Sequence, residues 1–142
     1  MLQAFKHPSV RDLAWVIASP AMLQAHKAQR PVFSAQDCSD AFAKTLARLQ
    51  KLEEDPAPLV SYLQQFENHR VGRYFEALTH YWLKHVAGLE VIANNLQLRD
   101  GNQTLGEMDF LFRENEQLVH WEVAVKYYLQ RAPGCEEHEF IG

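Results

Sequence analysis

The spacing of hydrophobic residues changes along the chain, from every third or fourth residue in the first half to every second residue after Gly88. Spacings of three and four place side chains on one face of a helix, whereas strict alternation places them on one face of a strand. The pattern therefore predicts helices up to Ala87 and strands after Gly88. We expect an α+β (mixed α/β) fold in which the helices come first.

Prolines divide the first half into separate helices. The expected helices follow Ser9, cover 21–28, run from Asp37 or Ser39 to about residue 52, and then cover 58–66 and 70–87. Ser9 and either Asp37 or Ser39 have side chains suited to an N-cap, and Pro20 is suited to open the second helix. The last helix has a wide apolar face, which we expect to lie on a sheet.

The second half predicts three strands joined by two tight turns. The expected strands are 89–99, 104–113 and 118–126. The turn residues 100–102 (Asp-Gly-Asn) and 114–116 (Glu-Asn-Glu) include types that tolerate a positive φ angle. Short turns join neighbouring antiparallel strands, so we expect an antiparallel three-stranded meander.

The length of 142 residues suits one domain, so we expect a helical region 1–66 and a core region 67–142 to pack as one globular unit. Hydrophobic residues make up 47% and charged residues 23%, which excludes disordered and low-complexity classes. The 14 Lys and Arg against 18 Asp and Glu give a net charge of −4. A surface that binds phosphate must therefore be local.

Cysteine content and hydropathy bear on the setting of the protein. Cys38 and Cys135 are far apart and form no disulfide framework, so we expect a reduced, cytoplasmic setting. No segment approaches the roughly 20 apolar residues of a membrane span, so we expect no membrane partner. The chain ends at 138–142 without a closing element, which suggests a C-terminal truncation. Missing residues or a second copy in a homo-oligomer would then complete the open sheet edge.

Candidate chemistry lies on one face of the predicted meander. Alternation places Asp109 of the second strand on the face opposite Phe110, and it places Glu122 and Lys126 of the third strand opposite Trp121. If these strands pair, two carboxylates and an amine share one face. Carboxylate oxygens are ligands that Mg²⁺ accepts, and a nearby lysine can orient the attacking water.

The long helix supplies a third acid. Glu76 lies one turn after Gly72, away from the apolar face of the helix. Glycine at this position permits a close approach of the helix backbone to the sheet or to a phosphate. A carboxylate beside such an approach can reach the same metal ion.

Three segments together resemble a known superfamily: 72–76 (GRYFE), 106–111 (GEMDFL) and 120–126 (HWEVAVK). They are similar to the helix-acid, strand-acid and strand Glu/Lys motifs of the PD-(D/E)XK phosphodiesterases, and more closely to a bacterial family of unknown function near that superfamily. The resemblance covers about residues 70–130 and implies a restriction-endonuclease-like core. It implies Glu76, Asp109 and Glu122 as ligands of Mg²⁺ or Mn²⁺, with Lys126 as the catalytic lysine beside Asp109 and Glu122.

One departure from the motif leaves the function open. Glu122 and Lys126 are four residues apart, whereas the superfamily separates its acid and lysine by two. A metal-dependent nuclease acting on DNA or RNA is the first hypothesis, with Arg73 and Lys84 as candidate contacts to the phosphate backbone. The alternatives are a catalytically inactive nuclease-like module that binds nucleic acid or protein, and a structural domain whose carboxylates form only surface pairs.

Overall fold

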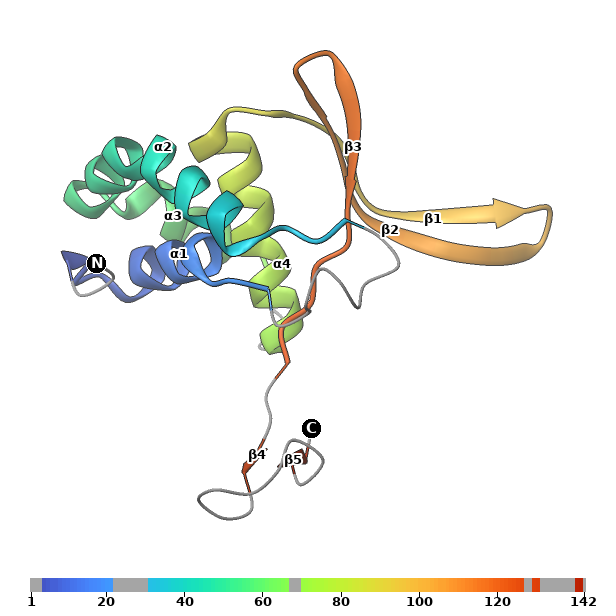
Figure 1. Ribbon diagram of the computed structural model, residues 1–142, viewed down its shortest axis with the longest axis horizontal. Coiled ribbons are helices and arrows are strands. Elements are labelled where there is room, and N and C mark those ends of the chain that lie inside the picture. Colours follow the sequence, from blue (N-terminus) through green and yellow to red (C-terminus); the bar gives the residue numbers. More distant parts are fainter. Residues whose placement is uncertain (1–3, 22–30, 67–69, 127–128, 131–139, 142) are drawn as a thin grey trace.

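A computed structural model of the protein describes residues 4–21, 31–66, 70–126, 129–130 and 140–141 (Figure 1). The helices are α1 (Pro8–Ala18), α2 (Ala35–Glu54), α3 (Ala57–Leu63), α4 (Val71–Tyr81) and the π-helix η3 (Trp82–Ala87). The strands are β1 (Glu90–Asp100), β2 (Gln103–Glu114), β3 (Gln117–Trp121), β4 (Leu129–Gln130) and β5 (Phe140–Ile141). The predicted order of helices followed by an antiparallel three-stranded meander is confirmed.

The helix starts differ from those predicted. α1 begins at Pro8 with His7 as its N-cap, so Ser9 lies inside the helix. α2 begins earlier than expected because Ser34 caps it through a capping box, in which Asp37 is the third helical residue instead of the cap. The helix expected over 21–28 lies almost entirely outside the described residues.

The long helix has the predicted extent, but its last turn is wider than an α-helix. α4 continues directly into the π-helix η3, and the chain then leaves the helix at Gly88, whose φ is +76°. A left-handed glycine after the last turn is a common helix terminator. The N–H of Leu89 donates to the carbonyl of Leu83 at 2.8 Å and closes this end.

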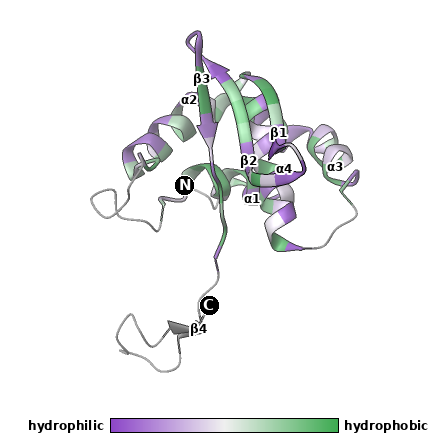
Figure 2. Cartoon of the chain, turned by 90° about the vertical axis from the view of Figure 1, so that its right-hand side faces the viewer, coloured by the Kyte–Doolittle hydropathy of each residue, from purple (hydrophilic) through white to green (hydrophobic). Residues whose placement is uncertain are grey.

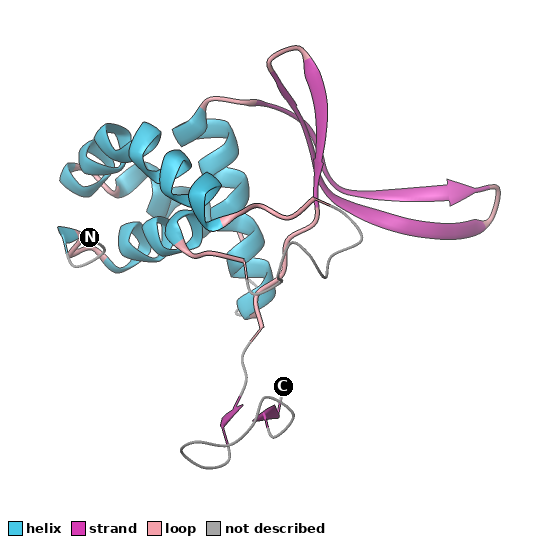
Figure 3. Cartoon of the chain, in the orientation of Figure 1, coloured by secondary structure: helices cyan, strands magenta, loops and turns pink. Residues whose placement is uncertain are grey.

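The main sheet has the strand order β1-β2-β3, with antiparallel pairing throughout. Both turns use left-handed residues as predicted, since φ is +57° at Gly101, +48° at Asn115 and +63° at Glu116. β1 and the facing part of β2 extend away from the helices as a long hairpin (Figure 3). β4 and β5 pair in a separate two-stranded sheet.

The third strand is shorter than predicted. β3 ends at Trp121, although 118–126 was expected to be one strand. The N–H of Val123 donates to the Asp109 carboxylate and is therefore occupied by a side chain instead of a neighbouring strand. The expected alternation nevertheless continues, because Val123 and Val125 are half-buried while Glu122, Ala124 and Lys126 are exposed.

One hydrophobic cluster joins the helices to the sheet. Side chains below 2% exposure come from both parts of the chain: Val10, Leu13, Leu49, Leu59, Leu78, Leu83, Phe110 and Phe112. In Figure 2, hydrophobic stretches along the strands alternate with hydrophilic ones. Helices from the region 1–66 thus share a core with α4 and β2. None of the described helices is long and apolar enough to cross a membrane.

Candidate functional site

Asp109 lies on β2 at the point where β3 ends. Phe110 pairs with Trp121 and Leu111 with His120, so continuing this register sets Asp109 opposite Glu122. The half-buried Asp109 accepts a hydrogen bond from the N–H of Val123 at its Oδ2, at 2.8 Å. This bond holds the residue after Glu122 against Asp109. Glu122 follows Trp121, the last paired residue of β3, and its backbone adjoins the N–H that Asp109 binds.

Glu122 has a partner on its own chain segment. Its Oε1 lies 2.5 Å from Nε2 of His120, and 54% of its side chain is exposed. His120 and Glu122 are two residues apart in nearly extended backbone, which brings their side chains to the same side. The His120 ring therefore orients the Glu122 carboxylate.

Glu76 is engaged elsewhere. It accepts from Nη1 of Arg73 at 3.3 Å, one turn earlier on α4. In the described part of the chain, no three His, Cys, Asp or Glu side chains are close enough together to hold a metal ion. The structure thus brings the Asp109 carboxylate to the backbone next to Glu122 and leaves Glu76 with Arg73. Among the described residues, none comes within 4 Å of a Cβ added at Gly72, so they make no close backbone approach there.

The predicted basic residues are all exposed. Lys126 lies beyond β3 and is exposed, as Glu122 is, and a fully extended backbone would separate their Cα atoms by roughly 13 Å. Arg73 forms the ion pair with Glu76, and Lys84 lies on η3. Burial first, and then the Lys84 charge, lower the pKa of His80. Lys84 therefore lies near a histidine that stays neutral at neutral pH.

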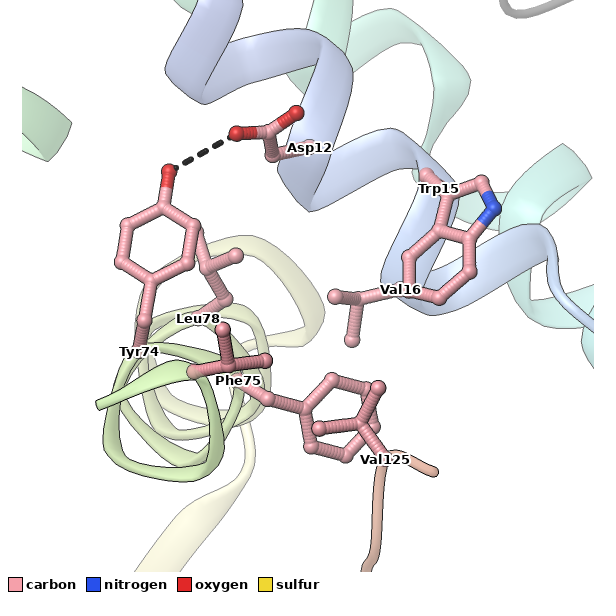
Figure 4. A pocket seen from close by; sticks show the side chains of 8 residues that line it. Asp12, Trp15, Val16, Tyr74, Phe75, Leu78 and Val125 are labelled. Atoms are coloured by element: carbon pink, nitrogen blue, oxygen red, sulfur yellow. Dashed lines mark hydrogen bonds between the residues drawn. The ribbon is translucent and has the colours of Figure 1, made fainter. Parts of the chain in front are cut away.

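A cavity of about 340 Å³ lies beside this segment, between α1, α4 and Val125 (Figure 4). Its lining residues are Asp12, Trp15, Val16, Val71, Tyr74, Phe75, Leu78 and Val125. The Tyr74 hydroxyl donates to Oδ2 of Asp12 at 3.0 Å. Burial, together with this bond and the Asp12 charge, raises the pKa of Tyr74 to about 12.

An aromatic cluster surrounds His80 on the other side of α4. Its Nδ1 is hydrogen-bonded to the Tyr62 hydroxyl, and its ring stacks on Phe110 with centroids 6.2 Å apart. The ring centroids of Tyr81 and His85 lie 4.8 Å apart, and the Tyr62 ring contacts both rings. The exposed His85 also has a lowered pKa, through burial and then the Lys84 charge. These rings mainly pack α3 against α4 and η3, and the His80 ring also contacts β2 through Phe110.

Comparison with known proteins identifies the family from almost the whole chain. The model of the DUF1853 family, described as a domain of unknown function, matches residues 11–142. This chain belongs to the DUF1853 family. No curated protein and no solved structure matches it. The family description names no activity, so the resemblance to PD-(D/E)XK enzymes and to a bacterial family remains a prediction.

The two acids of this DUF1853 domain have the chemistry that Mg²⁺ requires. Mg²⁺ binds hard oxygen ligands and commonly takes one or two carboxylates, with water and substrate phosphates at its other positions. Asp109 accepts one N–H at Oδ2, and an ionised carboxylate has about four acceptor positions, so the bond does not exhaust it. Asp109 and Glu122 are therefore ligand types that Mg²⁺ accepts.

Sequence reasoning on the DUF1853 domain missed the cavity and the Val123 bond. Asp12 and Tyr74 are 62 residues apart, and no local pattern indicates that they meet. Trp15 of α1 is 43% exposed, and only the packing of α1 shows that this large apolar side chain is not buried. The alternation of Val123 and Val125 did indicate that one side of the segment faces the core.

Proposed function

We propose that this protein is a divalent-metal-dependent phosphodiesterase that cleaves nucleic acid, with Asp109 and Glu122 as its cation ligands. The observation that supports the proposal is the β2–β3 register together with the Val123–Asp109 hydrogen bond. Continued one residue past Trp121, this register would set Asp109 opposite Glu122. The resemblance of 106–111 and 120–126 to the strand motifs of PD-(D/E)XK enzymes points to the same pair.

Each residue of the proposed site has a distinct role. Asp109 and Glu122 would hold Mg²⁺ or Mn²⁺, and His120 would position the Glu122 carboxylate through their contact. The bound cation supplies charge neutralisation at the phosphate and lowers the pKa of its water. Lys126 would place its ammonium near the phosphodiester, since its long stem recovers part of the separation from Glu122. Glu76 is outside the proposed ligand pair because it binds Arg73.

Mn²⁺ calorimetry on the wild type and on Asp109→Asn tests the cation site without a guessed substrate. Asparagine retains an oxygen that accepts the Val123 N–H but removes the charge that binds the cation. We expect saturable binding by the wild type and at least a 10-fold loss of affinity in Asp109→Asn. Glu107→Gln is the matched control, because Glu107 is an exposed acid two residues earlier on the same strand.

The outcome of this titration decides the proposal. Equal affinities for the wild type and Asp109→Asn would sink it, as would a wild type that folds but binds no Mn²⁺. If the site binds, a cleavage screen with single-stranded and duplex DNA and RNA follows, and Lys126→Ala is expected to lower cleavage while keeping Mn²⁺ affinity.

The long hairpin favours a second candidate, a non-catalytic interaction module. Leu96, Leu98 and Leu105 on β1 and β2 are 39%, 41% and 64% exposed, which is unusual for strand leucines. Binding of nucleic acid that weakens with salt, without cleavage under Mg²⁺ or Mn²⁺, would support this candidate. Turnover that depends on Asp109 would exclude it.

A further inference from the structure

Asp12 gives the cavity between α1, α4 and Val125 a single charge. The other seven described residues of its lining have aliphatic or aromatic side chains, and no Lys, Arg or His is among them. None of the ion pairs between described residues involves Asp12. Its Oδ2 accepts the Tyr74 hydroxyl at 3.0 Å, but a neutral donor does not cancel the charge of a carboxylate. The cavity therefore contains a negative charge that no described side chain pairs with.

Three aromatic rings lie around the same space. Trp15 of α1 and Tyr74 and Phe75 of α4 contribute them (Figure 4). Trp15 is 43% exposed, so a ligand can reach its indole from the solvent. The face of an aromatic ring is the negative side of its quadrupole and attracts a cation, and indole does so most strongly. The rings and the carboxylate thus favour the same sign of ligand charge.

The lining favours an organic cation over a metal ion. Mg²⁺ and Ca²⁺ take six or more oxygen ligands, whereas the side chains here offer one carboxylate and one phenol. An ammonium group needs fewer acceptors, and the carbon atoms attached to it can lie against Val16, Leu78 and Val125. The volume of about 340 Å³ is near the lower end for small-molecule sites. An amine with one ring or a short aliphatic chain suits these properties.

We propose that this cavity binds a small organic ammonium ion, with Asp12 as its hydrogen-bond acceptor and Trp15 as a ring against which it lies. The N–H groups of the ligand would use the acceptor positions of Asp12 that the Tyr74 hydroxyl leaves open, in charge-assisted hydrogen bonds. None of the lining residues belongs to the proposed cation site. The inference therefore does not depend on metal binding at Asp109 and Glu122.

Calorimetric titration of the full chain with three probes of similar shape tests the role of charge. The probes are 2-phenylethylamine, which is an ammonium ion at neutral pH, the neutral 2-phenylethanol and the anion 3-phenylpropanoate. All three carry a phenyl ring on a two-carbon chain, so their apolar contacts are matched. We expect saturable binding of the amine, binding of the alcohol that is weaker by about 10-fold or more, and no measurable binding of the anion.

Two aspartate variants assign the charge preference to the cavity. Asp12→Asn keeps an oxygen for the Tyr74 hydroxyl but removes the charge, so we expect amine binding to weaken about 10- to 150-fold. Asp100→Asn is the matched control, because it removes one charge from an exposed aspartate at the end of β1. We expect it to leave the affinity for the amine unchanged. Circular dichroism checks that both variants keep their helices.

Two aromatic variants test the rings. Trp15→Ala removes the indole and is expected to weaken amine binding about 2- to 30-fold. Tyr74→Phe keeps a ring and the Asp12 charge but removes the hydroxyl that competes for the carboxylate. We therefore expect Tyr74→Phe to bind the amine at least as tightly as the wild type does.

Several outcomes would overturn the inference. Equal affinities for the amine and the alcohol would show that the cavity selects apolar shape alone, and a folded wild type that binds no amine would exclude the site. Equal losses in Asp12→Asn and Asp100→Asn, or an unchanged affinity in Trp15→Ala, would place the binding elsewhere. Tighter binding of N-acetyl-lysine N-methylamide than of 2-phenylethylamine would identify a site for the lysine side chain of a partner protein instead.

Discussion

The carboxylate of Asp109 binds the backbone N–H of Val123, just beyond the end of β3. Its hydrogen bond to the Val123 N–H substitutes for a ladder bond, and this explains why β3 is shorter than the alternation of 118–126 predicted. A half-buried N–H that loses such a partner pays a desolvation cost. The stability of the fold and the proposed cation binding therefore both depend on the Asp109 side chain. Variants of Asp109 are needed that change one of these properties without the other.

Asp109→Ala and Asp109→Asn are expected to differ in stability. Alanine removes the acceptor of the Val123 N–H and is expected to lower the free energy of unfolding by about 1–3 kcal/mol. Asparagine keeps an acceptor oxygen and is expected to cost less than half of that. Urea unfolding followed by circular dichroism measures both values. Similar losses in the two variants would mean that charge, and not the hydrogen bond, stabilises the end of β3.

At the residue scale, His80 is expected to make the stability of the fold depend on pH. Burial, then the charges of Lys84 and His85, lower its pKa from the ordinary value of 6.5, and its Nδ1 bonds the Tyr62 hydroxyl. The unfolded chain therefore binds a proton at a higher pH than the folded chain does. The stability that neutral His80 contributes is present above about pH 6.5 and is lost as the pH falls toward the folded pKa.

Thermal unfolding at pH 7.5 and pH 5.5 measures this effect. We expect a lower Tm at pH 5.5 and a smaller difference between the two pH values in His80→Gln. His85→Gln is the comparison variant, since His85 is more exposed and its pKa is lowered by the same two causes, burial and Lys84. A pH difference that His80→Gln leaves unchanged would assign the dependence to other groups.

At the scale of elements, the junction between η3 and β1 depends on one glycine. Gly88 has a φ of +76°, and an added Cβ would lie 3.3 Å from Nη1 of Arg48. That nitrogen donates to the carbonyl of Val86 in the last turn, so the arginine is not free to move away. The strand direction after the helix therefore depends on a backbone conformation that other residues rarely adopt.

Gly88→Ala and Gly72→Ala are expected to change stability in opposite directions. Gly88→Ala should lower the free energy of unfolding by about 1–2 kcal/mol, because alanine is strained in the left-handed region. Gly72 is in α4 with open space around its Cα, so alanine should raise stability by up to about 1 kcal/mol. Chemical denaturation of both variants checks this pair. A loss in Gly72→Ala would indicate a close approach at that position after all.

At the scale of the whole molecule, one core includes residues from both predicted regions. Leu13 of α1, Leu49 of α2 and Phe110 of β2 are all at most 1% exposed and belong to the same cluster. α1 packs against both α2 and α4. Removing contacts in the first region should therefore destabilise the second, because the two regions do not have separate cores.

Leu13→Ala tests this shared core. We expect a loss of about 2–5 kcal/mol in the free energy of unfolding, as for other large-to-small substitutions in a core. Circular dichroism, which follows the helices, and tryptophan fluorescence, to which Trp82 and Trp121 contribute, are expected to give one coincident transition. Two separated transitions would show that 1–66 and the remaining chain unfold independently.

The sequence by itself determined the fold class, the long helix 70–87, the two turns and the faces of the strands. These features depend on local spacing and on turn residues such as Gly101 and Asn115, so a short segment carries the whole signal. Alternation and pairing also led to the prediction that Asp109 and Glu122 share a face. Their activity stays a prediction, because spacing places side chains without stating what they bind.

Only the tertiary structure decided where long-range partners lie. It joined Val123 to Asp109 across 14 residues and brought Asp12 and Tyr74 together across 62 residues. The cavity beside Val125 exists because α1 packs against α4 at one distance and angle, and no period in the sequence encodes these. Local patterns fix which face a side chain occupies, whereas the packing of elements that are distant in sequence fixes what that face meets.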